Sequence, residues 1–503
     1  MENLKLFKPG NYNLNMKFSE IRVIVFIFLM FCLGSSVQAK LILPAVFTDN
    51  MVLQQKSKIE IWGKSEALKN VTFTASWTTR KYKITADPLG NWKINIGTPS
   101  WGGPYAIHIS DGEEITLKNV MIGDVWFCSG QSNMEFPMHG WTSVNNYEKE
   151  LAEANYPNIR LLQATHVNSN LPLQNARIDN RGWKPCSSQN INEFSAVAYF
   201  FAREVYKKTG IPIGLIHSSW GGTVIEAWTS EQTIKTVPGF GPALAQLHQD
   251  ANSEKLSFTR EDANRPTALY NAMIHPFIHY KIKGVIWYQG ESNACRAHQY
   301  RSLFPALIKD WRQKWKLGDF PFYYVQVANY AKGEGDMLSW PELRDAQRQT
   351  LSVSNTGMAV TIDLGNPDDV HPRNKQDVGK RLALIALAKT YRQPVVYSGP
   401  VLKHYRISEN KVLLNFNFTE GGLQSKGDSL LNGFLIAGRD QKFYPAKGII
   451  KGNQIVVNSA EVPHPVAVRY AWANNPFCNL YNGAGLPASP FRTDHWKDST
   501  DPL

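Results

Sequence analysis

The stretch Gly123-Asp124-Val125-Trp126-Phe127-Cys128-Ser129-Gly130-Gln131-Ser132-Asn133-Met134 indicates how the middle of the chain folds. Its apolar run over 125–128 is typical of a short buried strand, and Gly130 supplies conformational freedom to the polar turn that follows. Ser132 is therefore expected just beyond the strand's carboxyl end, where an open α/β sheet gathers ligands and reacting groups. Taken alone, the stretch is better explained as an ordinary Gly-Ser turn.

Three later stretches repeat this pattern of an apolar run that ends in polar groups. Runs over 213–217, 282–288 and 358–362 lead into His217-Ser218-Ser219-Trp220-Gly221-Gly222-Thr223, Gln289-Gly290-Glu291-Ser292-Asn293 and Asp363-Leu364-Gly365-Asn366-Pro367-Asp368-Asp369-Val370-His371-Pro372. A further strand is expected over 322–327, and helices over 195–208, 300–315, 339–353 and 375–391. This alternation predicts an α/β domain with a mostly parallel sheet over 119–393, with 236–266 as an excursion from it.

The segments that flank this domain are predicted to be β-rich. Residues 40–118 alternate apolar and polar side chains between turns, which is typical of a small β-sandwich. Residues 394–503 contain four more strand-like runs, over 411–416, 433–436, 454–457 and 467–471. A chain of 503 residues is too long for one core, so two to four domains are expected.

The N-terminus has the features of a secretory signal peptide over residues 1–39. Residues 21–33 form an apolar run with a single charge, and small residues follow at Val37 and Ala39. Cleavage before Lys40 is therefore expected. The run is shorter than the ~20 residues that a membrane-spanning helix needs. We expect a periplasmic or secreted protein without a membrane span after cleavage.

Charge and cysteine content argue against several classes of partner. The formal net charge is +12, and because residues 1–39 carry four basic and two acidic side chains, about +10 remains after cleavage. This excess favours anionic substrates, but no Lys/Arg run or nucleic-acid module occurs. Neither CxxC nor H-E-x-x-H spacing occurs, so no metal or cofactor is expected. Disulfide pairing and oligomeric state stay undetermined for the four remaining cysteines, Cys128, Cys186, Cys295 and Cys478.

Ser132 is the candidate nucleophile for acyl transfer, a reaction that also needs a base, an acid that orients the base, and donors for the oxyanion. His371 is the candidate base, because it lies on a loop between a strand and a helix with carboxylates two and three residues before it. Those carboxylates, Asp369 and Asp368, are the two candidates for the acid.

Two other strand ends offer donors for the oxyanion. Adjacent Gly221 and Gly222 let a backbone N–H approach a ligand closely, and Gln289 can present its side-chain amide. Glu291 fits a structural role better than a catalytic one. The residues before the two glycines supply a weaker alternative base and two weaker nucleophiles, His217, Ser218 and Ser219.

Aromatic residues near these strand ends could stack on sugar rings. Aromatic side chains beside strands more often belong to the core, so on their own they only suggest a carbohydrate ligand. The residues concerned are Trp126, Trp220, Trp228, Trp287 and Tyr288.

The chain resembles bacterial sialate O-acetylesterase-type proteins of the SGNH hydrolase superfamily. The resemblance is carried by Gly130-Gln131-Ser132-Asn133-Met134, Trp220-Gly221-Gly222-Thr223, Trp287-Tyr288-Gln289-Gly290-Glu291-Ser292 and Asp369-Val370-His371-Pro372. Two flanking stretches extend it, Leu43-Pro44-Ala45-Val46-Phe47-Thr48-Asp49-Asn50-Met51-Val52-Leu53-Gln54 and Gly485-Leu486-Pro487-Ala488-Ser489-Pro490-Phe491-Arg492-Thr493-Asp494. The six stretches span about 41–494.

The resemblance implies a flavodoxin-like three-layer sandwich with a parallel sheet between the two β-rich domains. It makes Ser132 the nucleophile and His371 the base. It also implies an oxyanion hole formed by the N–H of Ser132, the N–H of Gly221 or Gly222, and the side chain of Gln289. The superfamily's D-x-x-H pattern selects Asp368 as the acid and the family's own pattern selects Asp369, with Asp368 slightly favoured.

The function that this resemblance implies is an exported carbohydrate O-acetylesterase that removes acetyl groups from sialic acid without a cofactor. Trp220, Trp287 and Tyr288 are the expected substrate-binding residues. Acetylated xylan or pectin sugars are alternative substrates. A non-catalytic carbohydrate-binding protein is the alternative of another class, and a thioesterase or lipase is less favoured because no long apolar lid is present.

Overall fold

The computed structural model of the protein describes residues 40–179, 182–249, 256–257, 259–332, 339–428 and 430–501. The predicted signal peptide over 1–39 and part of the predicted excursion over 236–266 lie outside these ranges. Within them, no helix combines the length and apolar character that crossing a membrane requires.

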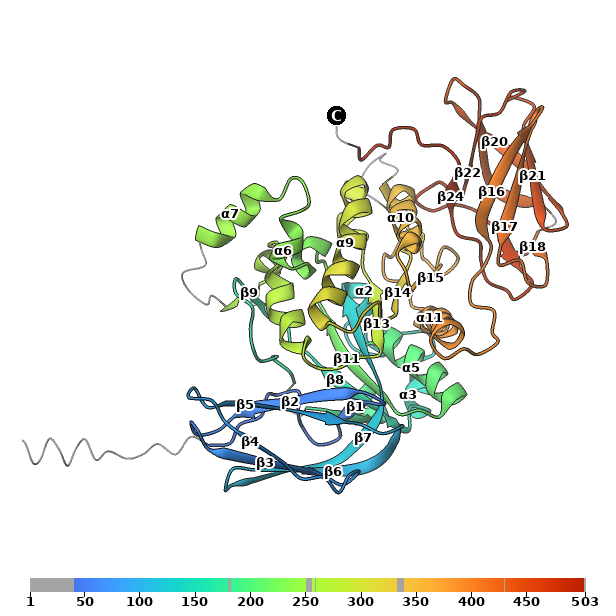
Figure 1. Cartoon of the computed structure of the whole chain (residues 1–503). Helices are drawn as coiled ribbons and strands as arrows, with labels where there is room; N and C mark the ends of the chain where they lie inside the picture. Colours follow the sequence, from blue (N-terminus) through green and yellow to red (C-terminus); the bar gives the residue numbers. More distant parts are fainter. Residues whose placement is uncertain are drawn as a thin grey trace, which may run out of the picture.

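The middle of the chain forms a sheet in which the strands are mostly parallel. Its main strands are β7 (Glu114–Gly130), β8 (Tyr156–Gln163), β10 (Lys184–Cys186), β11 (Ile213–Ser219), β13 (Gly284–Tyr288), β14 (Phe322–Val325) and β15 (Thr356–Ala359). They lie in the order β10-β8-β11-β7-β13-β14-β15, and Figure 1 shows this sheet in the middle of the molecule. Every pairing from β8 to β15 is parallel, and β10 pairs antiparallel with β8 at the edge. The predicted mostly parallel sheet is confirmed.

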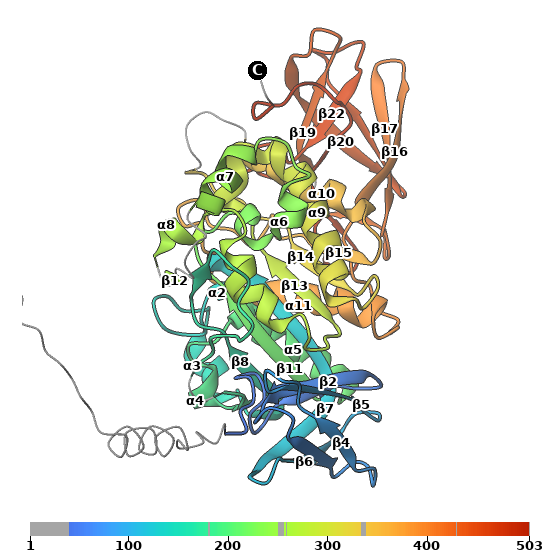
Figure 2. The same cartoon turned by 60° about the vertical axis from the view of Figure 1, so that its left-hand side comes forward.

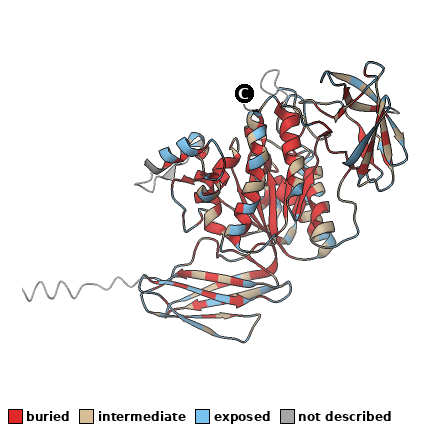
Figure 3. Ribbon diagram, turned by 45° about the horizontal axis from the view of Figure 1, so that its top comes forward, coloured by how far each residue is buried: buried red, intermediate tan, exposed pale blue. Residues whose placement is uncertain are grey.

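Helices cover both faces of this sheet. The run over 125–128 contributes to two cores, because successive side chains of a strand point to opposite faces. Val125 and Phe127 pack in one core with helices α9 (Ala297–Trp315) and α10 (Ser339–Gln349). Trp126 and Cys128 pack in the other with α5 (Ala196–Thr209) and α11 (Lys375–Lys389). Figure 3 shows the resulting buried interior.

Two strands of the sheet, β8 and β10, were not predicted from the sequence. Pro157 and Arg160 interrupt the apolar pattern of β8. Arg160 is nevertheless buried, because its guanidinium donates to the Pro157 carbonyl (2.6 Å) and to oxygens of Asn50 and Asn119. Asn50 and Asn119 are distant in sequence, so the local pattern does not indicate that this charge can be buried.

Strand β7 connects the sheet to the N-terminal β-rich region. Its first half pairs with β1 (Val52–Gln54) and β6 (Gly102–Ser110), and its second half with β11 and β13. The domain boundary expected at 118/119 therefore falls inside one continuous strand. The other strands here are β2 (Lys58–Lys64), β3 (Asn70–Ala75), β4 (Tyr82–Thr85) and β5 (Asn91–Gly97).

The C-terminal β-rich region lies at the opposite end of the α/β domain from the N-terminal one (Figures 1 and 2). Its antiparallel sheet contains β16 (Val401–Ser408), β17 (Lys411–Asn417), β19 (Leu431–Ala437), β20 (Phe443–Lys451), β21 (Gln454–Asn458), β22 (Ala467–Tyr470) and β24 (Phe491–Arg492). Shorter elements elsewhere are α3 (Tyr147–Ala152), α4 (Ser188–Ile191), α6 (Glu231–Ile234), α7 (Gly241–Gln249), α8 (Arg260–Ala263), β9 (Asn168–Ser169), β12 (Leu256–Ser257), β18 (Leu423–Ser425) and β23 (Leu480–Asn482).

Candidate active site

The turn after β7 brings Ser132 into contact with His371. Ser132 begins the short helix α2 (Ser132–Glu135), and its Oγ lies 2.8 Å from Nε2 of His371, which lies between β15 and α11. The turn requires glycine at position 130, where φ is 141° and a Cβ would lie 2.1 Å from the Tyr288 carbonyl oxygen. Two side chains 239 positions apart thus form a nucleophile–base pair.

The carboxylate beside the imidazole belongs to Asp369. Its Oδ1 lies 3.6 Å from Nδ1 of His371, and it also accepts the backbone N–H of His371 at 2.9 Å. Asp368, the slightly favoured candidate, instead lies 3.2 Å from Nζ of Lys332 with its side chain 76% exposed. The structure therefore brings Asp369, and not Asp368, toward the ring.

The two glycines after β11 have different surroundings. Gly221 packs against the nucleophile so closely that a Cβ there would lie 3.1 Å from Cβ of Ser132. Its N–H donates to Oε2 of Glu135 (2.5 Å), whose Oε1 pairs with His166 (3.0 Å). Gly222 lines the pocket that holds Ser132, and no acceptor for its N–H is recorded in the part of the chain that the structure describes.

Gln289 is fully buried behind the glycine turn. Its amide nitrogen donates to the Thr223 carbonyl (3.1 Å) and to Oδ1 of Asn293 (2.7 Å). Both amide hydrogens are thus used inside the protein, and among the described residues no partner is recorded for Oε1. In this conformation Gln289 holds the turn rather than facing the pocket.

Ser132 and His371 open onto a pocket of about 370 Å³. Trp141, 59% exposed, approaches His371 edge-on with ring centroids 5.3 Å apart, and so presents an aromatic surface beside the base. The volume of this pocket is large enough for a sugar-sized ligand. Its lining also includes Ser292, Cys295, Tyr330 and Trp340.

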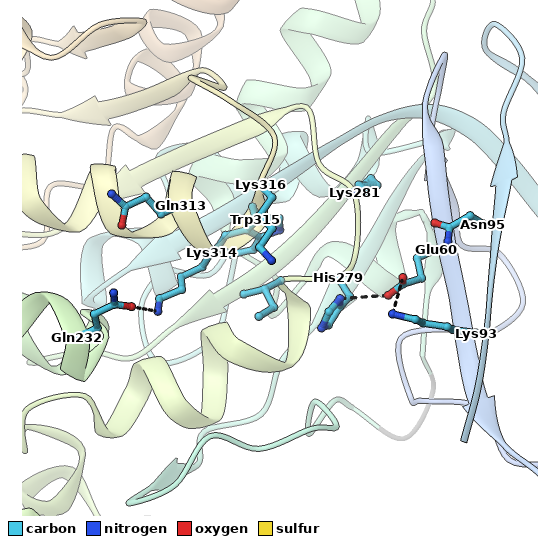
Figure 4. A pocket seen from close by; sticks show the side chains of 11 residues that line it. Glu60, Lys93, Asn95, Gln232, His279, Lys281, Gln313, Lys314, Trp315 and Lys316 are labelled. Atoms are coloured by element: carbon cyan, nitrogen blue, oxygen red, sulfur yellow. Dashed lines mark hydrogen bonds and ion pairs between the residues drawn. The ribbon is translucent and has the colours of Figure 1, made fainter. Parts of the chain in front are cut away.

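A larger hollow of about 700 Å³ lies between the N-terminal β-rich region and the end of α9 (Figure 4). Glu60 there pairs with Lys93 (3.6 Å) and His279 (3.1 Å), and Lys314 donates to Gln232 (2.8 Å). None of the described residues that line it is a serine or a cysteine. Size alone therefore does not identify the site of acyl transfer.

The alternative residues after β11 are buried. His217 accepts from Ser219 through Nε2 and donates through Nδ1 to Gln163 (2.7 Å), and burial lowers the pKa of His217 to about 4. Ser218 donates to the Met273 carbonyl (2.8 Å). None of these three side chains exposes more than 1% of its surface, so none is accessible to a substrate in this structure.

The predicted substrate-binding aromatics lie away from the pocket surface. Trp287 and Tyr288 have no exposed surface and belong to the cores on opposite faces of the sheet. Trp220 is 7% exposed and stacks on His166, with ring centroids 4.5 Å apart. Trp126 and Trp228 are also fully buried. A fully buried ring cannot stack on a sugar without rearrangement.

Four residues near the site were not predicted as functional. Asn133 directly follows the nucleophile and could have been noticed for that reason, whereas no local pattern marks the others. Their position depends on contacts between distant segments. They are Asn133, Glu135, Trp141 and Lys375.

The four cysteines in the described ranges are all free: Cys128, Cys186, Cys295 and Cys478. Among the described residues, no group of three or more His, Cys, Asp or Glu side chains is arranged to hold a metal ion.

The site has the arrangement that serine hydrolases use for acyl transfer, with a serine hydroxyl, an accessible imidazole, a nearby carboxylate and glycine N–H groups. Residues 122–388 match the family described as carbohydrate esterase, sialic acid-specific acetylesterase. The sialate O-acetylesterase of Mus musculus is 32% identical over 89% of this chain and 93% of its own length. The human sialate O-acetylesterase is 31% identical, with coverages of 88% and 90%.

A solved structure agrees with these relatives. A carbohydrate acetylesterase from Xanthomonas citri is 38% identical and superposes with a TM-score of 0.82, over 91% of this chain and all of that one. The chain belongs to the sialic acid-specific acetylesterase family of carbohydrate esterases. It is a carboxylic ester hydrolase that removes O-acetyl groups from carbohydrate. The family match and the named relatives therefore favour an enzyme over the alternative of a non-catalytic carbohydrate-binding protein.

Proposed function

We propose that the protein removes acetyl groups from O-acetylated sialic acid, with Ser132 as the nucleophile and His371 as the base. The observation that carries this proposal is the 2.8 Å contact between Oγ of Ser132 and Nε2 of His371 at an open pocket. The substrate is supported by the names of the mouse and human relatives.

The geometry supports a two-step reaction. Oγ of Ser132 attacks the acetyl carbonyl while Nε2 of His371 takes its proton. The imidazolium then returns that proton to the departing sugar oxygen, which leaves an acetyl group on Ser132. His371 then takes a proton from a water molecule as the water oxygen attacks this ester, and it returns that proton to Oγ of Ser132 when the acetyl–Oγ bond breaks and acetic acid leaves. Asp369 is the proposed acid, because its carboxylate stabilises the imidazolium from the Nδ1 side.

The proposed oxyanion donors are the backbone N–H groups of Ser132 and Gly222. The N–H of Gly221 already donates to the carboxylate of Glu135, and a negative charge there would repel a developing oxyanion. In this proposal Glu135 anchors Gly221 so that Gly222 faces the pocket. Gln289 supports the same turn through the Thr223 carbonyl.

The proposal also covers the fold class, a three-layer SGNH hydrolase fold, and the location of the protein, which is exported. A parallel sheet between two helix layers, with the nucleophile after a central strand, supports the three-layer SGNH hydrolase fold. The apolar run and small residues before Lys40 support export to the periplasm or beyond.

Acetate release from three substrates tests the choice of substrate. Acetylated sialic acid is expected to give the highest kcat/KM, and acetylated xylan and pectin fragments are the comparison, with Ser132→Ala as the blank. A preference for xylan or pectin would leave the esterase mechanism in place and replace the proposed substrate.

A further inference from the structure

A buried lysine lies directly behind the proposed catalytic pair. Lys375, the first residue of α11, has no exposed surface. Its Nζ donates to Oδ1 of Asn133 (2.6 Å) and lies 4.4 Å from the ring centroid of Phe136 and 5.6 Å from that of Tyr288. The ammonium therefore has aromatic faces around it and one short hydrogen bond, which leads to the neighbour of the nucleophile.

Asn133 connects the segments that meet at the site. Its amide nitrogen donates to Oε1 of Glu291 (2.5 Å) and to the carbonyl of Val370 (3.0 Å), the residue before His371. Three contacts fix which way this amide points, because Nζ of Lys375 donates to the amide oxygen while Glu291 and the Val370 carbonyl accept from the amide nitrogen. The Asn133 side chain thus joins the turn that holds Ser132 to Glu291 in the turn after β13 and to Val370 in the loop that holds His371.

Stability alone does not account for an ammonium at this position. Burial lowers the pKa of Lys375 to about 7, opposed by the charges of Glu291 and Asp369. Burial likewise raises the pKa of Glu291, opposed by its hydrogen bonds and by Lys375. Apolar residues of similar volume usually stabilise a core at least as well as a buried ion pair.

We propose that Lys375 is a positioning residue that holds the Ser132 turn against the His371 loop by orienting Asn133. It touches neither substrate nor the reacting atoms. The inference rests on the proposed roles of Ser132 and His371, and it adds that their 2.8 Å contact depends on a residue from α11.

The variant Lys375→Met removes the ammonium and keeps most of its volume. With a small aryl acetate as substrate, kcat should fall by roughly 10–100-fold while KM stays nearly constant, because misplacement of a catalytic pair by a fraction of an ångström affects the chemical step. The matched control is Lys389→Met on the same helix, since among the described residues that partly buried ammonium donates only to the Thr356 carbonyl. A folded Lys375→Met with wild-type kcat would overturn the proposal.

A double variant separates positioning from charge neutralisation. Lys375→Met also removes a positive charge that acts on the Glu291 carboxylate, and that loss can itself lower stability. Lys375→Met/Glu291→Gln removes both charges, so melting temperature should recover whereas kcat should stay low. Recovery of wild-type kcat in the double variant would show that Lys375 only neutralises Glu291, and would also contradict the proposal.

The rate at which a fluorophosphonate labels Ser132 keeps this inference distinct from the proposed function. Labelling of wild-type Ser132 with slower labelling in Lys375→Met is the expected result. Equal rates in the two proteins would remove the positioning role alone. Absence of labelling at Ser132 in the wild-type protein would instead remove the proposed nucleophile.

Discussion

At the scale of single residues, the protein contains two serine–histidine contacts that differ in access. Ser219 and His217 are hydrogen-bonded but buried, and burial holds the pKa of His217 near 4. Ser132 and His371 make a similar contact at a pocket, where the His371 side chain is 27% exposed. A nucleophile needs a substrate as well as a base, so access distinguishes the two pairs.

The choice between two neighbouring carboxylates is also a single-residue question. Asp369→Asn should lower kcat by roughly 10³–10⁴-fold, because it removes the charge that stabilises the imidazolium. Asp368→Asn, the matched control, should change kcat little, since its exposed carboxylate pairs with Lys332. Steady-state kinetics on purified variants decide the matter, and a larger loss in Asp368→Asn would reverse the assignment.

The buried amine of Lys375 should make stability depend on pH. Its pKa falls from the ordinary 10.5 to about 7 on folding. Between these values the unfolded chain binds more protons, so the free energy of unfolding of the wild-type protein should rise with pH relative to Lys375→Met. Urea unfolding at several pH values from about 7 to about 10 measures this difference. A constant or falling difference would contradict the inferred shift.

At the scale of elements, the turn that follows β11 and contains Gly221 must approach α2 closely. Gly221→Ala would place a Cβ 3.1 Å from both Cβ of Ser132 and Oε2 of Glu135. The resulting displacement of the nucleophile should lower kcat by up to about 100-fold. Kinetics and circular dichroism together test this, with Gly97→Ala in β5, where a Cβ would meet no atom within 4 Å, as a control for glycine removal. An active Gly221→Ala would show that the turn can relax.

The sequence predicted much of the element order, because strand ends and helices carry local signals. The run over 213–217 is β11, and the helix expected over 195–208 is Ala196–Thr209. Elements that depend on distant partners were missed, such as β8 with its buried Arg160.

The same distinction applies to the site. Ser132, His371 and the glycine pair were found from short motifs at strand ends. Glu135 and Lys375 were not, because their roles follow from contacts with Gly221 and Asn133, 86 and 242 positions away in the chain. Trp287 shows the opposite case, since its motif position suggested a sugar contact and the fold places it in the core.

At the scale of the whole molecule, a buried arginine connects the C-terminal region to the α/β domain. Arg344 of α10 donates to the carbonyls of Ala473 (2.9 Å) and Asn474 (2.6 Å), and burial lowers its pKa to about 9. The C-terminal segment is further held by Glu342, which accepts from Ser499 and Thr500. These contacts join the C-terminal region to α10, whose first turn lines the active-site pocket.

Arg344→Met should destabilise the protein by about 2 kcal/mol, because two charge-assisted hydrogen bonds are lost while the cost of burying the charge is relieved. Urea unfolding measures the change. Arg439→Met, at an exposed position of the C-terminal region, is the control and should have little effect. Equal stabilities for Arg344→Met and the wild-type protein would show that this connection contributes nothing net.

Identification of the nucleophilic residue tests the central claim most directly. Mass spectrometry after fluorophosphonate treatment should find one adduct, on Ser132, and Ser132→Ala should lose both the adduct and roughly 10⁶-fold in kcat. Labelling of a different serine, or acetate release by Ser132→Ala close to the wild-type rate, would contradict the account.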